Sequence, residues 1–228
     1  MKKASLTHTY EELNNSLKTI VNVVNSGPNE YTIDSIADGT GPSGEITIKQ
    51  SPIAGGKLAA YVNVTSIVID VGTEKLITYA FSPVPNMRTA RIKSAGSFDQ
   101  RVFLGCTNLE SVIYDRTCAA NSGSWMFDGC TSLKFLDYGI SSRFGGAAFK
   151  KCPLETIILR KTDGCCACDF TGSFPTFDYS PTIDEGGTGC TIYVPAALID
   201  AYKSDTNWAA WDAYGTITWK TIEGSEYE

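Results

Sequence analysis

The sequence contains one cysteine-bearing pattern three times, and this repetition constrains the fold more than any other feature. The copies occupy residues 103–114, 127–138 and 149–159, and each begins with a phenylalanine that precedes a cysteine by three positions. The phenylalanines recur about every 22 to 24 residues, a period typical of stacked repeats. A single copy cannot bury its own apolar side, whereas stacked neighbours share one continuous core. The sequence therefore predicts a β-rich solenoid with one short strand in each copy.

Three apolar positions recur inside every copy and indicate which side chains face the core. A degenerate copy and a fainter one precede the three clear copies. We expect a last strand at residues 190–195, after an irregular insertion over residues 162–189, so that roughly five or six rungs stack. The expected core side chains are, copy by copy, Val64, Ile67 and Ile69; Met87, Ala90 and Ile92; Leu109, Val112 and Tyr114; Leu133, Leu136 and Tyr138; and Leu154, Ile157 and Leu159.

The spacing Phe-x-Gly-Cys-x-x-Leu-x-x-[Val/Leu]-x-[Tyr/Leu] resembles the BspA-like leucine-rich repeats of bacterial surface and phage proteins. Residues 192–208 also resemble the terminal cap that often closes such arrays in proteins of gut bacteria and their phages. The resemblance extends over about residues 62–228 and implies a leucine-rich-repeat solenoid with short parallel strands. It implies a binding surface but no particular ligand, because proteins of one fold serve many functions.

The N-terminal segment carries a second pattern, which predicts an amphipathic helix. Residues 9–12 fit a capping box, in which a hydroxyl and a carboxylate accept hydrogen bonds from backbone N–H groups at a helix start. An isolated amphipathic helix of about fifteen residues is marginal in water. Its own chain, further copies or a larger assembly must therefore cover its apolar stripe. The segment resembles the short N-terminal helices of phage fibre and baseplate proteins. The stripe consists of Leu13, Leu17, Ile20, Val21 and Val24.

These patterns divide the chain into four parts. They are a helical anchor (residues 1–27), a small β-rich adaptor or N-terminal cap (28–61), the leucine-rich-repeat solenoid (62–195) and a C-terminal cap (196–228). The adaptor contains an alternating strand at residues 45–49. In the C-terminal cap, Pro195 opens a helix and residues 217–222 alternate as a closing strand. We expect Trp208 and Trp211 to cover the core rather than to form a ligand platform.

Charge and hydropathy argue against two classes of protein. The formal net charge of −6 disfavours a nucleic-acid-binding protein, which needs clustered Lys and Arg to neutralise phosphates. No stretch approaches the roughly 20 apolar residues that cross a bilayer. The first residues place polar and acidic side chains where a secretory signal has its apolar core, so we expect no export by that route.

The eight cysteines raise the question of disulfides or a metal site. Five of them suit buried free thiols, since three hold the same position in successive copies and two are interpreted in the same way. The other three form a cluster that could contribute to a zinc site or exchange disulfides. Adjacent cysteines fit one tetrahedral centre poorly and the usual pair of C-x-x-C arms is missing, so we favour loop thiols and expect no metal and no cofactor. The repeat cysteines are Cys106, Cys130 and Cys152, with Cys118 and Cys190 beside them, and the cluster is Cys165, Cys166 and Cys168.

Residues suited to catalysis are sparse. The only histidine is His8, so a Ser-His or Cys-His nucleophile would require that residue to fold back across the molecule. The sequence has no glycine-rich phosphate loop, no G-x-S-x-G elbow and no H-E-x-x-H helix. An acid–base pair of the glycosidase kind is conceivable, but the spacing brings no two carboxylates together uniquely. We interpret the candidates, Asp115, Asp128, Asp137 and Asp184, as solvated surface acids and expect no enzyme.

Side chains that alternate with the core positions should lie in rows across the outer face of the sheet. In the third row, Asp70, Lys93 and Asp115 would pair with one another at little gain in stability. The three rows are Ser66, Thr89, Ser111, Phe135 and Thr156; Val68, Arg91, Ile113, Asp137 and Ile158; and Asp70, Lys93, Asp115, Gly139 and Arg160.

Two neighbours in these rows, Ile113 and Phe135, are apolar, and exposed apolar neighbours often mark a contact surface. Burial of these side chains against a loop or an adjacent subunit is the alternative. Our hypothesis is that Phe135, Ile113, Arg91 and Asp137 contact a protein or a glycan.

Together, the repeats and the N-terminal resemblance favour a non-enzymatic bacteriophage virion protein, such as a head fibre, tail fibre or baseplate appendage. We expect a homotrimer that is assembled in the host cytoplasm and bound through its N-terminal segment to capsid, tail or baseplate proteins. Its partner would be a host-surface protein or glycan, with no nucleic acid and no membrane span involved. The alternative is a BspA-like bacterial surface adhesin or secreted binding protein, located at the cell surface.

Overall fold

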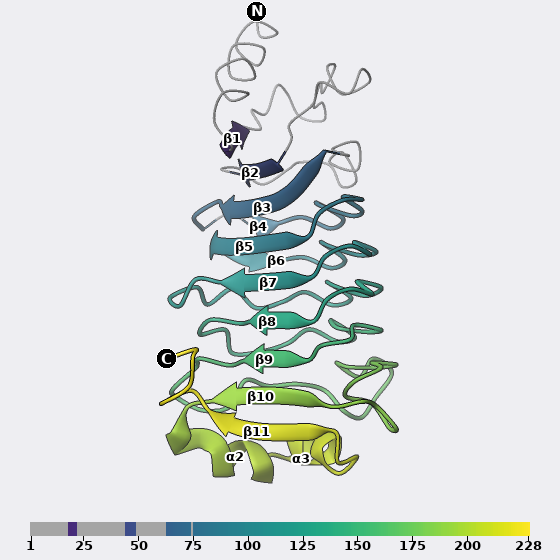
Figure 1. Ribbon diagram of the computed structural model, residues 1–228, viewed down its shortest axis with the longest axis vertical. Helices are drawn as coiled ribbons and strands as arrows, with labels where there is room; N and C mark the ends of the chain where they lie inside the picture. The colour runs from purple at the N-terminus through teal and green to yellow at the C-terminus, as the bar shows by residue number, and fades with distance from the viewer. Residues whose placement is uncertain (1–17, 22–43, 49–62, 74) are drawn as a thin grey trace, which may run out of the picture.

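The computed structural model describes residues 18–21, 44–48, 63–73 and 75–228, which form a solenoid of stacked parallel strands (Figure 1). Within these ranges nine strands make one sheet in the order β1-β2-β3-β5-β7-β8-β9-β10-β11, and β4 pairs with β6 behind it. Three helical segments follow β10. The elements are β1 (Lys18–Val21), β2 (Gly44–Ile48), β3 (Val64–Asp70), β4 (Lys75–Leu76), β5 (Thr89–Ser94), β6 (Ser97–Phe98), β7 (Ser111–Tyr114), β8 (Phe135–Asp137), β9 (Thr156–Ile158), β10 (Cys190–Val194), η2 (Ala196–Leu198), α2 (Ile199–Ser204), α3 (Thr206–Asp212) and β11 (Ile217–Thr221).

An aromatic column runs through the core. Phe81, Phe103, Phe127, Phe149 and Phe177 are fully buried, and neighbouring ring centroids in this column lie 5.1 to 5.9 Å apart. This spacing follows from the separation of about 4.8 Å between neighbouring strands. Every core side chain expected from the repeat pattern is buried. The prediction of a β-rich solenoid of stacked parallel strands is therefore confirmed.

The repeated cysteines are buried free thiols, as the pattern predicted. Each thiol donates a hydrogen bond to the backbone oxygen of the phenylalanine in the preceding rung. In a later rung Ser180 takes the place of the cysteine, and its Oγ donates to the backbone oxygen of Cys152 at 2.8 Å. The Phe81 rung holds the buried Val84 at this position, so the position takes a small side chain, and the cysteines and Ser180 use their donors there. The three thiol bonds run from Cys106 to Phe81 (3.2 Å), from Cys130 to Phe103 (3.2 Å) and from Cys152 to Phe127 (3.1 Å).

The expected N-terminal helix is not confirmed. Lys18–Val21 form strand β1, which pairs in parallel with β2, so Ile20 and Val21 lie in a strand. The helix prediction is wrong over these residues because the run from Thr19 to Val21 is β-branched, and such side chains favour strands. The other residues of the expected stripe, Leu13, Leu17 and Val24, lie outside the described residues.

The strand expected at residues 45–49 is confirmed as β2, and it continues the same sheet as β3. Residues Ile46 to Ile48 of β2 pair one to one with residues of β3, without a register shift. This segment therefore stacks on the repeats as a further rung. The boundaries between the four parts of the chain stay predictions.

The expected C-terminal cap is confirmed. Asp205 caps α3, because its Oδ1 atom accepts hydrogen bonds from the N–H groups of Asn207 (3.0 Å) and Trp208 (3.1 Å). Trp208 and Trp211 are buried, and the indole N–H of Trp208 donates to the backbone oxygen of Cys166 at 2.7 Å. Both tryptophans therefore cover the last rungs, and β11 closes the sheet beside β10.

Candidate binding surface

The outer face of the sheet carries the rows of side chains that the sequence predicted. The strand register confirms the first two rows over β3, β5, β7, β8 and β9. The third row is wrong at its start, because a register shift after Ile69 places Asp70 beside Ser94 instead of Lys93. Ser94 Oγ donates to Asp70 at 2.8 Å, and Asp115 pairs with Arg91 at 2.8 Å.

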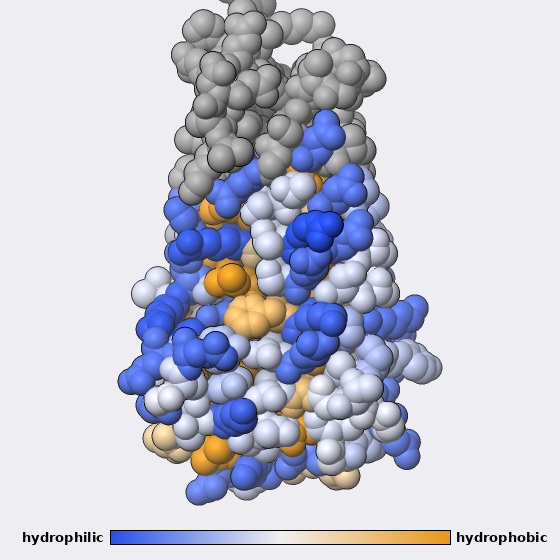
Figure 2. Space-filling model, in the orientation of Figure 1, coloured by the Kyte–Doolittle hydropathy of each residue, from blue (hydrophilic) through white to orange (hydrophobic). Residues whose placement is uncertain are grey.

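The structure brings together the four side chains of the predicted contact. Arg91, Ile113 and Asp137 are successive members of one row, and Phe135 stands two residues before Asp137 in β8. Ile113 is 39% exposed, Phe135 is half-buried and Asp137 is buried. Figure 2 shows apolar atoms in the middle of this face with hydrophilic side chains on both sides.

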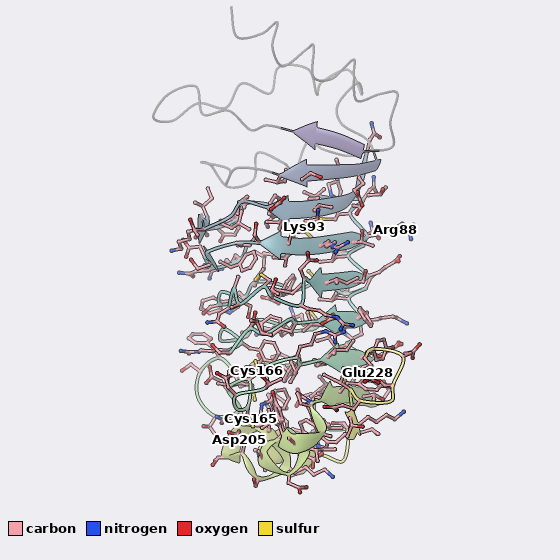
Figure 3. The ribbon with its side chains drawn as sticks, turned by 90° about the vertical axis from the view of Figure 1, so that its left-hand side faces the viewer. Arg88, Lys93, Cys165, Cys166, Asp205 and Glu228 are labelled. Carbon is pink, nitrogen blue, oxygen red and sulfur yellow. The ribbon has the colours of Figure 1, made fainter. Side chains whose placement is uncertain are left out.

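The C-terminal segment, defined here as residues 223–228, folds back over the lower part of this face (Figure 1). The Tyr227 ring lies 4.8 Å from the Tyr193 ring and 5.9 Å from the Phe135 ring, measured between centroids. Arg116 donates to the backbone oxygen of Glu228 at 2.6 Å. Figure 3 shows Glu228 on the outer side of the strands. Phe135 is thus covered in part by its own chain, which was one of the two alternatives.

Arg160 joins this segment to the sheet. Its guanidinium donates to both carboxylate oxygens of Asp137, with Nε–Oδ1 and Nη2–Oδ2 distances of 2.8 Å, and its Nη1 donates to the backbone oxygen of Tyr227 at 2.9 Å. Both side chains of the ion pair are only 11% exposed. A bidentate pair of this kind fixes the guanidinium plane. Asp137 therefore orients Arg160 and has little surface to offer a partner.

The clustered cysteines lie beside the C-terminal cap. Cys166 and Cys168 are buried, Cys165 is partly exposed, and the Cys166 N–H donates to the Tyr202 hydroxyl at 2.8 Å. Burial raises the pKa of the Cys165 thiol, so it is not an activated nucleophile. Figure 3 shows Cys165 and Cys166 near Asp205. In the described part of the chain, no group of three or more potential ligands is placed to hold a metal ion.

The candidate acids do not form a catalytic pair. Asp115 pairs with Arg91 and Asp137 with Arg160, while Asp184 accepts hydrogen bonds from the N–H groups of Tyr179 (3.0 Å) and Glu185 (2.9 Å). Asp128 lies half-buried in the turn that carries Phe127. His8 lies outside the described residues.

Sequence reasoning missed the contact between Tyr227 and the sheet. The segment has no repeat, and Tyr227 reaches Phe135 from a distant part of the chain, so periodicity cannot reveal the contact. The only sequence feature that pointed to this area was Arg160, because the third predicted row ends with Arg160 at the lower end of the outer face.

Comparison with known proteins assigns the repeats to a family. Residues 54–163 match the family model described as BspA type Leucine rich repeat region, in six copies. The comparisons found no matching curated protein and no matching solved structure.

Across the described ranges, no helix has the length and hydropathy needed to cross a membrane. Repeat solenoids of this kind are typically binding scaffolds without enzymatic activity, which supports a binding or adhesin-type role. Residues 54–163 of the chain are therefore a BspA-type leucine-rich repeat region.

Proposed function

We propose that this is a non-enzymatic binding protein whose partner docks on the open part of the outer sheet face. The observation that carries the proposal is the position of Ile113, an exposed isoleucine in the middle of a sheet face, above the area that the C-terminal segment covers. Phe135 extends the apolar area on the neighbouring strand. The ion pair of Arg91 with Asp115 borders it, as polar side chains border the apolar centre of an interface.

Replacing Ile113 with Asp tests the docking face. Fluorescently labelled full chain would be applied to a panel of intact gut bacteria, and cell-bound label would be measured by flow cytometry. We expect Ile113→Asp to weaken binding at least about tenfold, because it places a charge in the apolar centre of the contact.

Ile140→Asp is the matched control for this experiment. Ile140 is 40% exposed, close to the 39% of Ile113, but it lies in the turn after β8. Equal binding by the two variants would show that the outer sheet face is not the docking site.

At a finer level, we propose a bacteriophage virion role, as a head fibre, tail fibre or baseplate appendage that attaches to a host-surface protein or glycan. Residues 1–27 would join copies into a homotrimer and bind capsid, tail or baseplate proteins. The resemblance of residues 6–17 to the short N-terminal helices of phage fibre and baseplate proteins supports the proposal. In addition, β1 ends the sheet within the described ranges, and an end rung needs a cover, which neighbouring copies can supply.

Light scattering tests the assembly. We expect the full chain to have a mass of about 74 kDa, three times the 24.6 kDa of one chain. A variant that lacks residues 1–17 keeps β1 and should be a monomer. Monomers in both cases would contradict the trimer and favour a bacterial surface adhesin, and mass spectrometry of purified virions would then decide between the two locations.

A further inference from the structure

Four exposed or half-buried side chains form a line on the turn segments behind the sheet, and we call this line the aromatic ladder: Tyr79, Arg101, Trp125 and Phe174. The Arg101 guanidinium carbon lies 5.9 Å from the Tyr79 ring centroid and 4.6 Å from that of Trp125. The rings of Trp125 and Phe174 meet edge to face at 4.7 Å. Tyr79 is 39% and Phe174 is 51% exposed. The ladder crosses several rungs and offers two aromatic surfaces with a cation between them.

The fold does not explain the choice of these side chains. Tyr79, Arg101 and Trp125 each stand two residues before a core phenylalanine, and their φ angles are 60°, 57° and 53°. Glycine or asparagine adopts this left-handed conformation most readily, and a bulky side chain there is an outlier. In the next rung the same position holds Ala147, with φ 52°, so the rung needs no large side chain. Residues held in such strained conformations cluster at functional sites.

Small residues bring Trp125 and Phe174 together across the intervening rung. A Cβ atom on Gly146 would lie 3.2 Å from the Cβ of Phe174, and one on Gly145 would lie 2.4 Å from the backbone carbon of Gly123. Both glycines therefore permit close approach of successive turn segments. As a result, the two rings form a corner that opens to solvent beside Arg101.

Arg101 differs in its partners from three other arginines of the repeats. Arg88, Arg91 and Arg160 pair with carboxylates at 2.6 to 2.8 Å. The Arg101 guanidinium donates only to the side-chain amide oxygen of Gln100 at 3.2 Å, and no carboxylate of the described residues pairs with it. Stacking between two rings orients the guanidinium and removes part of its water, which favours a bidentate contact with a carboxylate.

We propose that the aromatic ladder binds an acidic saccharide. The apolar face of a pyranose ring would stack in the corner of Trp125 and Phe174, and its carboxylate would accept hydrogen bonds from Arg101. The rung spacing of about 4.8 Å is comparable to the length of one sugar unit in an extended chain, so Tyr79 can meet a further unit. This site is separate from the outer sheet face and does not depend on the proposed docking there.

The test applies the full chain to an array of acidic and neutral oligosaccharides that includes galacturonate, glucuronate and sialic acid, followed by calorimetric titration of those that bind. We expect binding to acidic members only. Trp125→Ala and Arg101→Gln should each weaken it at least about tenfold. Far-ultraviolet circular dichroism would verify that both variants remain folded.

Tyr179→Ala serves as the matched control, because Tyr179 is 67% exposed, has a φ of 53° and lies 5.0 Å from the Lys150 ammonium but outside the ladder. This variant should bind like the wild type. Three results would overturn the proposal: no binding to any acidic member, equal binding to neutral members, or undiminished binding by the Trp125 and Arg101 variants.

Discussion

Replacing Phe127 with Ala is expected to lower the free energy of unfolding by about 3 to 5 kcal/mol. The ring is fully buried and stacks between Phe103 and Phe149, with centroid distances of 5.2 Å on both sides. Backbone hydrogen bonds hold the rungs at a fixed spacing, such as that from the Phe127 N–H to the Ala148 oxygen at 2.8 Å, so the neighbours cannot close the cavity. Urea unfolding followed by circular dichroism measures the loss.

Phe174→Ala is the control, because it makes the same substitution at a ring that is 51% exposed. It should change the free energy of unfolding by less than about 1 kcal/mol. Because each rung of a solenoid contacts only its neighbours, the Phe127 variant should also lose hydrogen-exchange protection first in residues 103–149. Similar losses for both phenylalanine variants would contradict the role of the aromatic column.

Replacing Asp137 with Ala is also expected to lower the free energy of unfolding by about 3 to 5 kcal/mol, because it leaves the Arg160 guanidinium buried without its carboxylate. The two side chains are 11% exposed, so water replaces the lost partner poorly. Arg160 also donates to Tyr227, and the C-terminal segment should therefore loosen. Urea unfolding gives the stability, and the rate at which carboxypeptidase removes residues 223–228 reports the loosening.

Asp115→Ala is the matched control for Asp137→Ala. Its partner Arg91 is 55% exposed and Asp115 itself 29%, and exposed pairs contribute only about 0 to 1 kcal/mol. If both aspartate variants lost the same stability and released the C-terminal segment equally, Asp137 would have no special role in holding it.

The sequence was sufficient to predict the core and two rows of the outer face, because a repeat of constant length places equivalent residues in register. It failed at Asp70, where a bulge moves the register by one residue without any change in the pattern. It also failed at Ile20 and Val21, whose spacing fits a helix while their branched side chains fit a strand.

Two features of the surface had no periodic signal at all. Tyr227 reaches Phe135 only after the chain has passed through the whole cap and turned back. Trp125 stands at a position whose left-handed backbone is set by contacts with the next rung, such as the hydrogen bond from its N–H to the Gly146 oxygen at 2.9 Å. Propensity and spacing describe neither kind of contact.

The hydrogen bonds of the repeated thiols bear on how cysteines in such arrays are interpreted. Ser180 occupies the cysteine position of its rung and, like the cysteines, donates to a backbone oxygen of the rung before it. Val84 fills the same position in the Phe81 rung, so the rung selects for a small volume rather than for sulfur chemistry. Successive copies can exchange cysteine for serine while the backbone keeps its path. The number of cysteines in a repeat array of this type is consequently a poor guide to the redox environment in which the protein works.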